Sequence, residues 1–486
     1  MAQTVDVVVL GGGPGGLSAA TTLAIRGLDV AVINNGHLMG YGIEGAFKSK
    51  AAFEIARFYA HLTLRQDLFK ITSTPSFGAV KHSIERAAKD LTSGIETRLQ
   101  RLGIKLLNGK GHFADPNTIV VGKETLQSQH IVIATGSVPR VFAGVTVDGK
   151  RVLTSDEIVR LPSLPKSLLI LGAGVIGCEF ASIFNELGSR VQLVDTQARI
   201  LSSEDEDVSG FLERGFALRG IEVIPSCRFE KLEVTDEGVC TTLSNGQQVQ
   251  TTSVLFAVGR NANTRDLNLD ISGVEADERG YIPTSDDMRT NVPHIYAVGD
   301  VGERNTPTDI ALVHVAQAEG RCAAYSILGE EFTQNMDHVP YIIFTIPMIA
   351  GAGVNETIAR ERYGDVRVGK YPYGRNHRAH AMFQPIGFVK LIVGPEGDDR
   401  ILGIRAIGRD ADALVAASSI MIERALPYER ALPYTYILDS IMPHPSLMEC
   451  LQGAAHIVAG DALKYEEGEE FLYNYLVGDQ VRTLRE

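Results

Sequence analysis

Two glycine-rich motifs in this chain have the residue types and the spacing that bind a dinucleotide pyrophosphate. The pattern G-x-G-x-x-G occurs at Gly11, Gly13 and Gly16 and again at Gly172, Gly174 and Gly177. The first glycine allows a tight turn, the second lets the backbone approach the pyrophosphate, and the third lets helix and strand pack closely. The phosphates then bind the free N–H groups and the positive dipole end of the following helix.

A ribose-binding residue is expected at the end of the second strand of each unit. Asn34 follows Gly11 by 23 residues (34 − 11), and Asp195 follows Gly172 by 23 residues (195 − 172). A carboxylate there binds both hydroxyls of an unphosphorylated ribose and repels a 2′-phosphate, so Asp195 favours NADH over NADPH. Asn34 accepts a hydrogen bond without the charge-assisted strength of a carboxylate. Alternatively, Asn34 only starts the turn at 34–36.

Strand, loop, helix and strand surround each glycine motif, which is the setting that positions a dinucleotide. Asp6 to Leu10 and Val30 to Ile33 are short β-branched runs, with a helical pattern through Ile25 between them. Leu168 to Gly172 opens a second unit of the same kind. Because both motifs lie in this β-α-β context, the sequence predicts two bound dinucleotides in one chain and electron transfer between them.

The remaining patterns complete a multidomain α/β protein. Helices are predicted at 51–65, 83–102 and 411–423, and strands at 109–113, 131–136, 389–393 and 401–407. The runs 256–260 and 295–300 resemble strand ends that close the second unit and return the chain to the first. From Pro340 the chain reads as an α+β domain. The predicted fold class is α/β, with two Rossmann-like nucleotide-binding domains plus an α+β C-terminal domain.

Composition limits the possible functions. A chain of 486 residues with a net charge of −13 predicts several domains and argues against general nucleic-acid binding. No apolar run reaches the ~20 residues that span a bilayer, and no secretory signal is expected. The cysteines have no metal-site or disulfide spacing, which predicts free thiols, no metal and a cytoplasmic location. They are Cys178, Cys227, Cys240, Cys322 and Cys450.

Eight motifs in fixed order carry a resemblance over about Val5 to Ala459. They are GGGPGG at 11–16, ATGSVPR at 134–140, GAGVIGCEFASIF at 172–184, AVGRNANT at 257–264, YAVGD at 296–300, HVAQAEG at 314–320, FTIP at 344–347 and HPSLMEC at 444–450. With these motifs the chain resembles the class I pyridine nucleotide-disulfide oxidoreductases.

The resemblance implies a homodimer with FAD in the first domain and a nicotinamide cofactor in the second. It predicts a discontinuous FAD domain at 1–149 and 278–338, an NAD domain at 150–277, a dimerisation domain at 339–464 and a C-terminal extension at 465–486. It assigns FAD binding to Gly11, Gly13, Gly16, Asn34, Lys50, Gly111, Thr135, Gly136, Asp300, Leu312 and His314. It assigns nicotinamide binding to Gly172, Gly174, Ile176, Gly177, Glu179, Asp195 and Gly259.

Lys50 and Glu179 match an ion pair that lies beside flavin N5 in this family. The ammonium would stabilise negative charge developing on the flavin, and the carboxylate would hold the ammonium in place. Read without the resemblance, Lys50 is a solvated residue in a Lys-Ser-Lys turn and Glu179 is an acid on a helix surface.

The segment from Ile33 to Lys50 departs from the family pattern GGTCLNVGCIPSK. Aligned on Ser49-Lys50, Tyr41 and Ala46 stand where the two reactive cysteines belong, and Lys48 replaces a proline. Without sulfur beside the flavin, electrons cannot leave by thiol–disulfide exchange. Tyr41 and Ala46 are instead expected to leave an open slot for a flat acceptor, lined by His444 of the partner subunit.

His444 and Glu449 match the family's acid–base dyad. A carboxylate orients an imidazole, which can move protons near neutral pH. Alternatively, the two residues only brace the dimer interface, because the thiols that they would serve are missing.

These residues predict an FAD-dependent enzyme that passes electrons from NADH to a small non-disulfide acceptor, either a quinone-like molecule or a second nicotinamide. The predicted catalytic residues are Tyr41, Lys50, Glu179, His444 and Glu449. Two alternatives remain. One is a non-catalytic or regulatory FAD- and NAD-binding homodimer that acts through the tail at 465–486. The other is dihydrolipoyl dehydrogenase-like activity that uses an external thiol.

Overall fold

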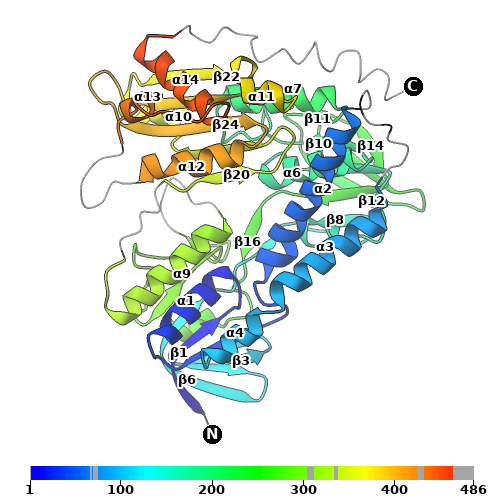
Figure 1. Ribbon diagram of the computed structural model, residues 1–486. Helices are drawn as coiled ribbons and strands as arrows, with labels where there is room; N and C mark the ends of the chain where they lie inside the picture. The colour runs from blue at the N-terminus through cyan, green and yellow to red at the C-terminus, as the bar shows by residue number, and fades with distance from the viewer. Residues whose placement is uncertain are drawn as a thin grey trace.

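Three sheets organise the chain in the computed structural model (Figure 1). The structure describes residues 2–65, 68, 70, 75–303, 311–332, 338–423 and 432–462. The predicted C-terminal extension at 465–486 lies outside these residues. The α/β fold class expected from the sequence is confirmed, because the glycine loops follow parallel strands of two sheets and a third, antiparallel sheet comes after them. The first sheet is mixed, since β4, β5 and β6 pair antiparallel.

The first sheet has the strand order β3-β2-β1-β6-β5-β4, and β18 also pairs with β6. Its strands are β1 (Gln3–Leu10), β2 (Val30–Asn34), β3 (Lys105–Asn108), β4 (Gly111–Asp115), β5 (Thr118–Val121), β6 (Glu124–Ile133) and β18 (Ile295–Ala297). Leu10 pairs with Ile33 and Ile133, and Ala297 also pairs with Ile133. Four parallel strands therefore end at one edge, where α/β sheets bind ligands.

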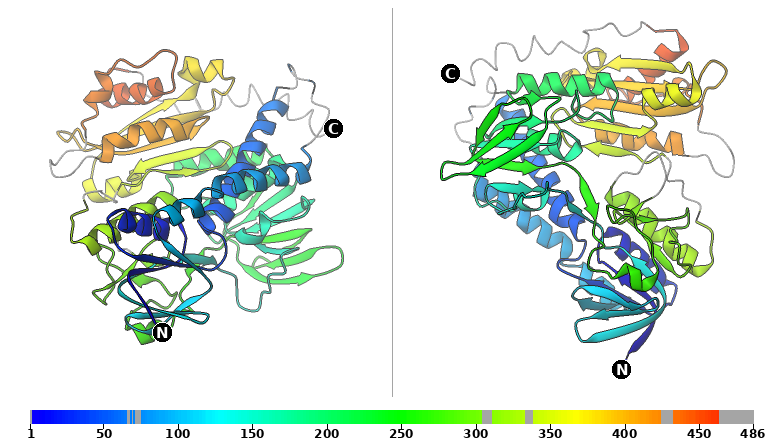
Figure 2. Two further views of the ribbon diagram at one scale, coloured as in Figure 1. Left: turned by 60° about the horizontal axis from the view of Figure 1, so that its bottom comes forward. Right: turned by 180° about the vertical axis from the view of Figure 1, so that it is seen from behind.

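Helix α1 (Pro14–Ile25) follows the first glycine loop and packs along α9 (Val313–Leu328), as Figures 1 and 2 show. A side chain at Gly320 would lie 2.2 Å from the carbonyl oxygen of Gly15. The two helices can therefore approach this closely only because glycine occupies the contact. This packing brings the start of α9, more than 290 residues later in the chain, beside the first glycine loop.

The second sheet repeats the arrangement with the order β11-β10-β9-β15-β8. Its strands are β8 (Val152–Thr154), β9 (Ser167–Leu171), β10 (Arg190–Val194), β11 (Glu222–Ile224) and β15 (Ser253–Phe256). Helix α6 (Val175–Glu186) follows the second loop, and α5 (Ser155–Ile158) and α7 (Glu206–Leu218) flank the sheet. An antiparallel layer that the sequence did not predict is inserted before β15. It contains β12 (Phe229–Val234), β13 (Val239–Leu243) and β14 (Gln248–Thr251).

The C-terminal sheet has the order β20-β21-β24-β23-β22. Its strands are β20 (Tyr341–Ile343), β21 (Ile349–Gly353), β22 (Arg367–Pro372), β23 (Gly387–Val393) and β24 (Ile401–Gly408). Every residue of β23 and β24 is buried. Helices α12 (Ala411–Glu423) and α14 (Met448–Ala459) pack on the sheet, and side chains of the second unit contact Phe388 and Ile407.

Short elements connect these layers. The helices are α8 (Leu269–Ser272), α10 (Glu356–Tyr363), α11 (His377–Ala381), α13 (Thr435–Leu438) and the 3₁₀ turn η2 (Tyr373–Arg375). The paired strands are β7 (Ser137–Pro139) with β16 (Arg260–Ala262) and β17 (Ile282–Pro283) with β19 (Gly302–Glu303). Among the described residues, no helix combines the length and the apolarity needed to cross a bilayer.

Buried ion pairs join the second unit to the C-terminal sheet. The Lys390 ammonium is only 2% exposed and lies 2.9 Å from Asp205, 2.8 Å from Asp207 and 2.9 Å from Glu356. Three carboxylates around one buried lysine offset the high free-energy cost of moving that charge out of water. The two layers are therefore connected by charge as well as by apolar packing.

Helix α2 (Lys48–Thr63) connects the first unit to the second. Its residues Phe53 and Ala56 are fully buried in the same apolar cluster as Phe180 and Phe184 of α6. The helix starts at Lys48 rather than at the predicted 51. Because α2 packs on α6, the first turn of α2 faces the start of α6 across the junction.

One predicted helix is wrong in its extent. The pattern at 83–102 forms two helices, α3 (Phe77–Thr92) and α4 (Ile95–Arg101). The break falls at Ser93 and Gly94, since glycine destabilises a helix interior by about 1 kcal/mol relative to alanine. The strand predicted at 131–136 is also wrong in its extent, because β6 begins at Glu124, seven residues earlier (131 − 124), and ends at Ile133. The predicted helix at 411–423 and the predicted strands at 109–113, 389–393 and 401–407 lie within two residues of the observed limits.

Candidate active site

A cavity of about 1140 Å³ runs between the first glycine loop and helix α6. Pockets for drug-sized ligands occupy roughly 300–1,000 Å³, so this cavity has the size expected for a larger ligand such as a dinucleotide. Its walls come from both nucleotide-binding units and from α9 and α12. Cysteine does not occur among the described residues that line it.

The first glycine loop fits the pyrophosphate of FAD. Gly11 has φ = +118°, and a side chain there would lie 2.2 Å from the carbonyl oxygen of Ala134. A side chain at Gly16 would lie 2.0 Å from the carbonyl oxygen of Gly11, whereas one at Gly13 has no neighbour closer than 3.9 Å. The loop is thus tightly packed on its protein side and open at Gly13. No side chain caps α1, which leaves its N–H groups available to a phosphate.

Thr135 supplies a second indication of a ligand. Its hydroxyl is buried and makes no hydrogen bond among the described residues, although Thr135 lines the cavity. A buried hydroxyl without a partner is costly, so a polar atom of a bound group is expected beside it. Together with the open Gly13 position, this orphaned hydroxyl fits FAD in the first unit.

Asn34 holds the first loop through both ends of its amide. The side chain is buried; its Oδ1 accepts a hydrogen bond from Gly12 N at 3.0 Å, and its Nδ2 donates to Gly36 O at 2.7 Å. Asn34 therefore shapes both the glycine loop and the turn at 34–36. Asn34 stabilises the turn and also lines the cavity, and its contact with a ribose stays a prediction.

Asp195 occupies the same place in the second unit. Its Oδ2 accepts a hydrogen bond from Ala173 N at 2.5 Å, and its Oδ1 accepts from Gln197 N at 2.8 Å. Gly174 is exposed, and a side chain there would meet nothing within 4 Å. The second loop is therefore open to solvent where a dinucleotide would approach.

Lys50 and Glu179 form the ion pair that the resemblance predicts. Lys50 Nζ lies 2.7 Å from Glu179 Oε2, and the carboxylate is only 6% exposed. Phe344 orients both groups, because its N–H donates to Glu179 Oε1 at 3.0 Å and its ring centroid lies 4.9 Å from Lys50 Nζ. The ammonium is thus fixed at the wall where the first unit meets α6.

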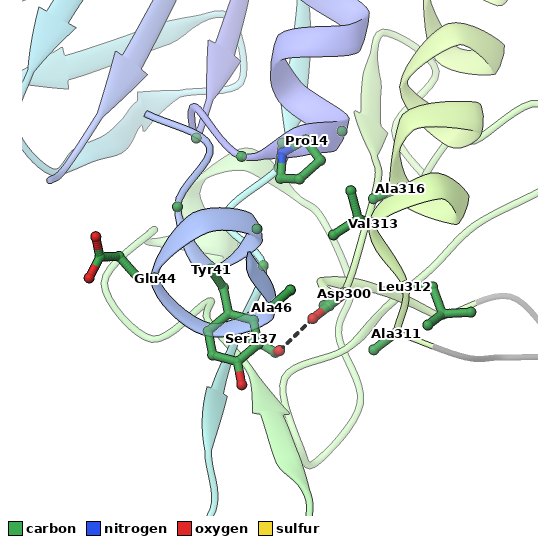
Figure 3. Close-up of a pocket in the computed structure, with 18 of the residues that line it drawn as sticks. Pro14, Tyr41, Glu44, Ala46, Ser137, Asp300, Ala311, Leu312, Val313 and Ala316 are labelled. Carbon is green, nitrogen blue, oxygen red and sulfur yellow. Dashed lines mark hydrogen bonds between the residues drawn. The ribbon is translucent and has the colours of Figure 1, made fainter. Parts of the chain in front are cut away.

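Tyr41 precedes a π-helical turn, η1 (Gly42–Phe47), in the segment without cysteines. A side chain at Gly45 would lie 2.1 Å from the Tyr41 ring, and the Arg260 guanidinium lies 4.2 Å from the ring centroid. The ring is therefore enclosed between Gly45 and Arg260. Tyr41 and Ala46 both line the cavity (Figure 3), and the open slot expected beside them stays a prediction.

Arg260 connects the Tyr41 ring to Asp300. Its guanidinium donates to Ser137 Oγ at 2.7 Å, and Ser137 Oγ donates to Asp300 Oδ2 at 2.8 Å, as Figure 3 marks. Burial raises the pKa of the Tyr41 phenol, an effect that Arg260 only partly offsets, so Tyr41 stays protonated at neutral pH. Burial also raises the pKa of Asp156, whose carboxylate lies 3.9 Å from Arg260.

Ion pairs anchor the π-helical turn. The buried Lys48 ammonium lies 3.0 Å from Glu44 and 3.0 Å from Glu85 of α3. Glu44 also lies 3.1 Å from Arg160, near the end of α5. Lys48, the residue that departs from the family's proline, therefore ties the turn to α3, and Glu44 ties it to the second unit.

His444 and Glu449 form a hydrogen-bonded pair outside the cavity. His444 Nδ1 lies 2.8 Å from Glu449 Oε1, and the His444 side chain is 60% exposed. Ser446 N donates to Glu449 Oε2 at 2.8 Å. Neither dyad residue lines the cavity of its own chain.

The structure brings most, though not all, of the predicted site residues together. The cavity walls include Gly11, Gly13, Asn34, Tyr41, Lys50, Gly111, Thr135, Gly136, Ile176, Glu179, Asp300, Leu312 and His314. The remaining predicted residues lie elsewhere: Gly16, Gly172, Gly174, Gly177, Asp195, Gly259, His444 and Glu449 do not line it. Three further residues contact the site but were not predicted from the sequence, although each lies within one of the eight motifs: Ser137, Arg260 and Phe344.

Comparison with known proteins identifies the family. Residues 5–320 match the family model described as pyridine nucleotide-disulphide oxidoreductase, and residues 339–455 match its dimerisation domain. The chain belongs to the pyridine nucleotide-disulphide oxidoreductase family. It is an FAD-dependent oxidoreductase that binds a pyridine nucleotide, and its dimerisation domain supports a homodimer.

Curated relatives match nearly the whole chain. Dihydrolipoyl dehydrogenase of Chlamydia muridarum is 34% identical over 461 residues, covering 92% of this chain and 96% of the relative. Dihydrolipoyl dehydrogenase of Mycobacterium tuberculosis is 32% identical over 473 residues, covering 95% of this chain and 99% of the relative.

Solved structures share the fold. LpdA from Mycobacterium tuberculosis superimposes with a TM-score of 0.84 at 25% identity, covering 94% of this chain and all of that chain (100%). The HOCl-induced flavoprotein disulfide reductase RclA from Escherichia coli superimposes with a TM-score of 0.82 at 25% identity, covering 93% of this chain and 100% of that chain.

Proposed function

We propose that the protein transfers electrons from NADH through FAD to a small acceptor that is not a disulfide. The observation that carries the proposal is the composition of the cavity. It combines the first glycine loop with the Lys50–Glu179 pair and contains no cysteine among its described lining residues. FAD, when bound, supplies the two-electron chemistry between the nicotinamide and the acceptor.

The chain's own residues supply position and charge. Glu179 holds the Lys50 ammonium at the cavity wall, where a cation favours negative charge on a neighbouring group. Tyr41 and Ala46 take the two places where the family pattern has its reactive cysteine pair, so no protein sulfur would relay electrons. A quinone-like molecule or a second nicotinamide remains as the acceptor class.

NADH is the proposed donor rather than NADPH. Asp195 presents a carboxylate at the ribose position, which disfavours a 2′-phosphate. The nearby Arg199 is already engaged, since its guanidinium donates to Glu204 O at 2.7 Å, to Ser209 Oγ at 2.8 Å and to Ser202 O at 2.9 Å. Arg199 is therefore poorly placed to neutralise a 2′-phosphate.

His444 and Glu449 are proposed to take part in delivering the proton that such an acceptor needs. They do not line their own cavity, so they would serve the cavity of the other subunit in a homodimer. The predicted division into FAD, NAD and dimerisation domains belongs to the same proposal, as does the assignment of individual FAD- and NADH-binding residues.

An anaerobic titration followed by an acceptor screen tests the proposal. NADH should bleach the flavin absorbance without a thiolate-to-flavin charge-transfer band. A benzoquinone or a nicotinamide analogue should then restore the absorbance at least tenfold faster than lipoamide. The double variant Tyr41→Cys/Ala46→Cys is the matched control, because it restores the sulfur pair and should show the charge-transfer band.

A second candidate is dihydrolipoyl dehydrogenase-like activity with an external thiol, favoured by the names of the curated relatives. Repeating the screen with and without added low-molecular-weight thiols separates the two. Lipoamide turnover by the unmodified chain without added thiol would contradict the proposal. Flavin reduction by NADH with no acceptor giving turnover would favour a regulatory protein.

A further inference from the structure

A second histidine contacts the predicted dyad. His377, the first residue of α11, places its Nδ1 3.3 Å from Nε2 of His444. The two ring planes meet at 81° with centroids 5.1 Å apart. Since Glu449 already binds His444 Nδ1, both ring nitrogens of His444 have protein partners. The three side chains form a linear series from Glu449 through His444 to His377.

The ionised carboxylate determines which atom is the donor and which is the acceptor in each of these two hydrogen bonds. An ionised carboxylate only accepts hydrogen bonds, so Nδ1 of His444 carries the hydrogen toward Glu449. Nε2 of a neutral His444 is then an acceptor, and the hydrogen between the rings belongs to His377 Nδ1. When His377 is also protonated at Nε2, it is a cation whose charge His444 and Glu449 stabilise. The order of contacts is that of a serine-hydrolase triad, in which a carboxylate binds one ring nitrogen of a histidine and the other ring nitrogen accepts a hydrogen bond from a third group.

The Asn376 side chain joins the two segments that carry the histidines. Asn376 is buried, and its Nδ2 donates to Ser446 O at 2.9 Å. Its Oδ1 accepts from Ala379 N at 3.0 Å, which caps α11. One amide therefore fixes the start of α11 to the loop that carries the dyad.

The pKa of Glu449 supports its role as an ionised hydrogen-bond acceptor. Burial raises the pKa of Glu449, but the Ser446 N–H, His444 and His377 together lower it below its ordinary value. The carboxylate is therefore ionised at neutral pH and available to orient both rings. His377 and His444 are both exposed, so the series ends at the surface of the C-terminal sheet rather than inside it.

We propose that His377 is the terminal proton donor for the acceptor and that His444 and Glu449 orient it. This inference rests on the proposed function. A quinone-like acceptor gains two electrons as a hydride equivalent, which NADH supplies by way of FAD, and one proton, which His377 Nε2 supplies. His377 becomes neutral, keeps its Nδ1–H toward His444 and regains a proton from water. Atoms and charge balance as NADH + H⁺ + acceptor giving NAD⁺ + reduced acceptor.

The test compares His377→Gln with His380→Gln in the FAD-loaded dimer. His380 lies on the same short helix, but its Nε2 contacts Gly374 O at 2.8 Å and not the dyad. Loss of a general acid typically lowers a rate by about 10²–10⁴-fold. We expect His377→Gln to lower quinone turnover at least 10-fold while NADH still bleaches the flavin at the wild-type rate. His380→Gln should change both rates less than twofold.

Two further measurements separate proton transfer from a structural role. Imidazole added to His377→Ala should restore at least part of the lost turnover. In protein labelled at histidine ¹³Cε1, the His444 resonance should shift in His377→Gln and stay in place in His380→Gln, whatever the activity. Quinone turnover of His377→Gln within twofold of wild type would overturn the inference, as would an unchanged His444 resonance. Failure of the proposed function would instead appear in the wild-type protein, as an absence of turnover with every acceptor.

Discussion

The two glycine loops of this chain share one geometry but differ in how they hold the ribose position. In both, the third glycine lies against the first: a side chain would come within 2.0 Å of Gly11 O at Gly16 and within 1.8 Å of Gly172 O at Gly177. In both, the loop N–H after the first glycine binds the ribose-position side chain. That side chain is a buried amide, Asn34, in the first unit and a partly exposed carboxylate, Asp195, in the second.

This difference suggests that the first unit retains its ligand permanently, whereas the second unit binds and releases its ligand in each catalytic cycle. The first loop is covered by α9 and lies at one end of a large cavity, so enclosure can retain a cofactor without a charged ribose contact. The second loop is exposed at Gly174, so its ligand must be recognised at each turnover. A charge-assisted hydrogen bond is roughly twice as strong as a neutral one, which suits the second task.

Gly177→Ala should have the largest effect and should show that the loop geometry is common to both units. A methyl group 1.8 Å from a backbone oxygen cannot be accommodated without moving the strand or the helix. We expect a loss of about 3 kcal/mol or more in the free energy of unfolding by urea, and a similar loss for Gly16→Ala. Gly210→Ala in α7 is the control, since its side chain would meet only Arg214 Nη1 at 3.4 Å. Equal stability of Gly177→Ala and wild type would refute the shared packing.

Gly174→Ala should separate binding from folding in the second unit. Nothing in the protein lies within 4 Å of the added side chain, and the backbone there is extended (φ −74°, ψ −168°). Stability should therefore change by less than about 0.5 kcal/mol. The methyl group would stand where a pyrophosphate approaches, so NADH affinity should fall at least about tenfold, or about 1.4 kcal/mol. Isothermal titration with NADH measures this loss; unchanged affinity would place the nucleotide elsewhere.

Asp195→Asn should make the second unit resemble the first. Removing the charge weakens the ribose hydrogen bonds, so the KM for NADH should rise roughly 5- to 10-fold, equivalent to about 1–1.4 kcal/mol. Discrimination against NADPH should fall, while the FAD content per subunit should stay the same. Steady-state kinetics with both nucleotides provide the measurement. A change in FAD content instead would mean that Asp195 does not belong to the nicotinamide half.

Asn34→Asp makes the reverse exchange and should have the smallest effect. The new carboxylate would face Gly36 O at the 2.7 Å now spanned by the Asn34 Nδ2 hydrogen bond. Replacing a donor by an acceptor there should cost about 1 kcal/mol and lower FAD retention instead of improving it. The ratio of flavin to protein absorbance after dialysis checks this, with the exposed neighbour Asn35→Asp as control. Tighter FAD retention would show that charge, and not enclosure, limits the first unit.

Local patterns in the sequence were sufficient for much of the fold. The glycine spacing and the β-branched runs located both parallel sheets, and the fixed spacing to Asn34 and Asp195 located the residues that bind each loop. Helix α12 has the predicted limits of 411–423. These features depend on residues that lie close together in the chain, which is why periodicity and spacing reveal them.

Periodicity and spacing in the sequence could not predict contacts between distant segments of the chain. The ring of Tyr41 lies against an arginine 219 positions later (260 − 41), and nothing around Tyr41 indicates that pairing. Likewise, Phe344 orients a lysine and a glutamate from two other segments. The antiparallel layer β12–β14 was not predicted, although β13 alternates buried and half-buried residues. His377 could have been singled out only with the register between α11 and the 444–449 loop known.

The buried Lys390 side chain limits how the second unit can move relative to the C-terminal sheet. Removing one partner of a buried ion pair typically costs about 3–5 kcal/mol, and Lys390 has two such partners across the junction, Asp205 and Asp207. Separating the second unit from the C-terminal sheet would break both ion pairs together and leave the charges without their partners. We therefore expect the second unit and the C-terminal sheet to move together as a rigid body. Any opening motion that admits a nucleotide is then expected between the first and second units, around α2 and the strands that return to the first sheet.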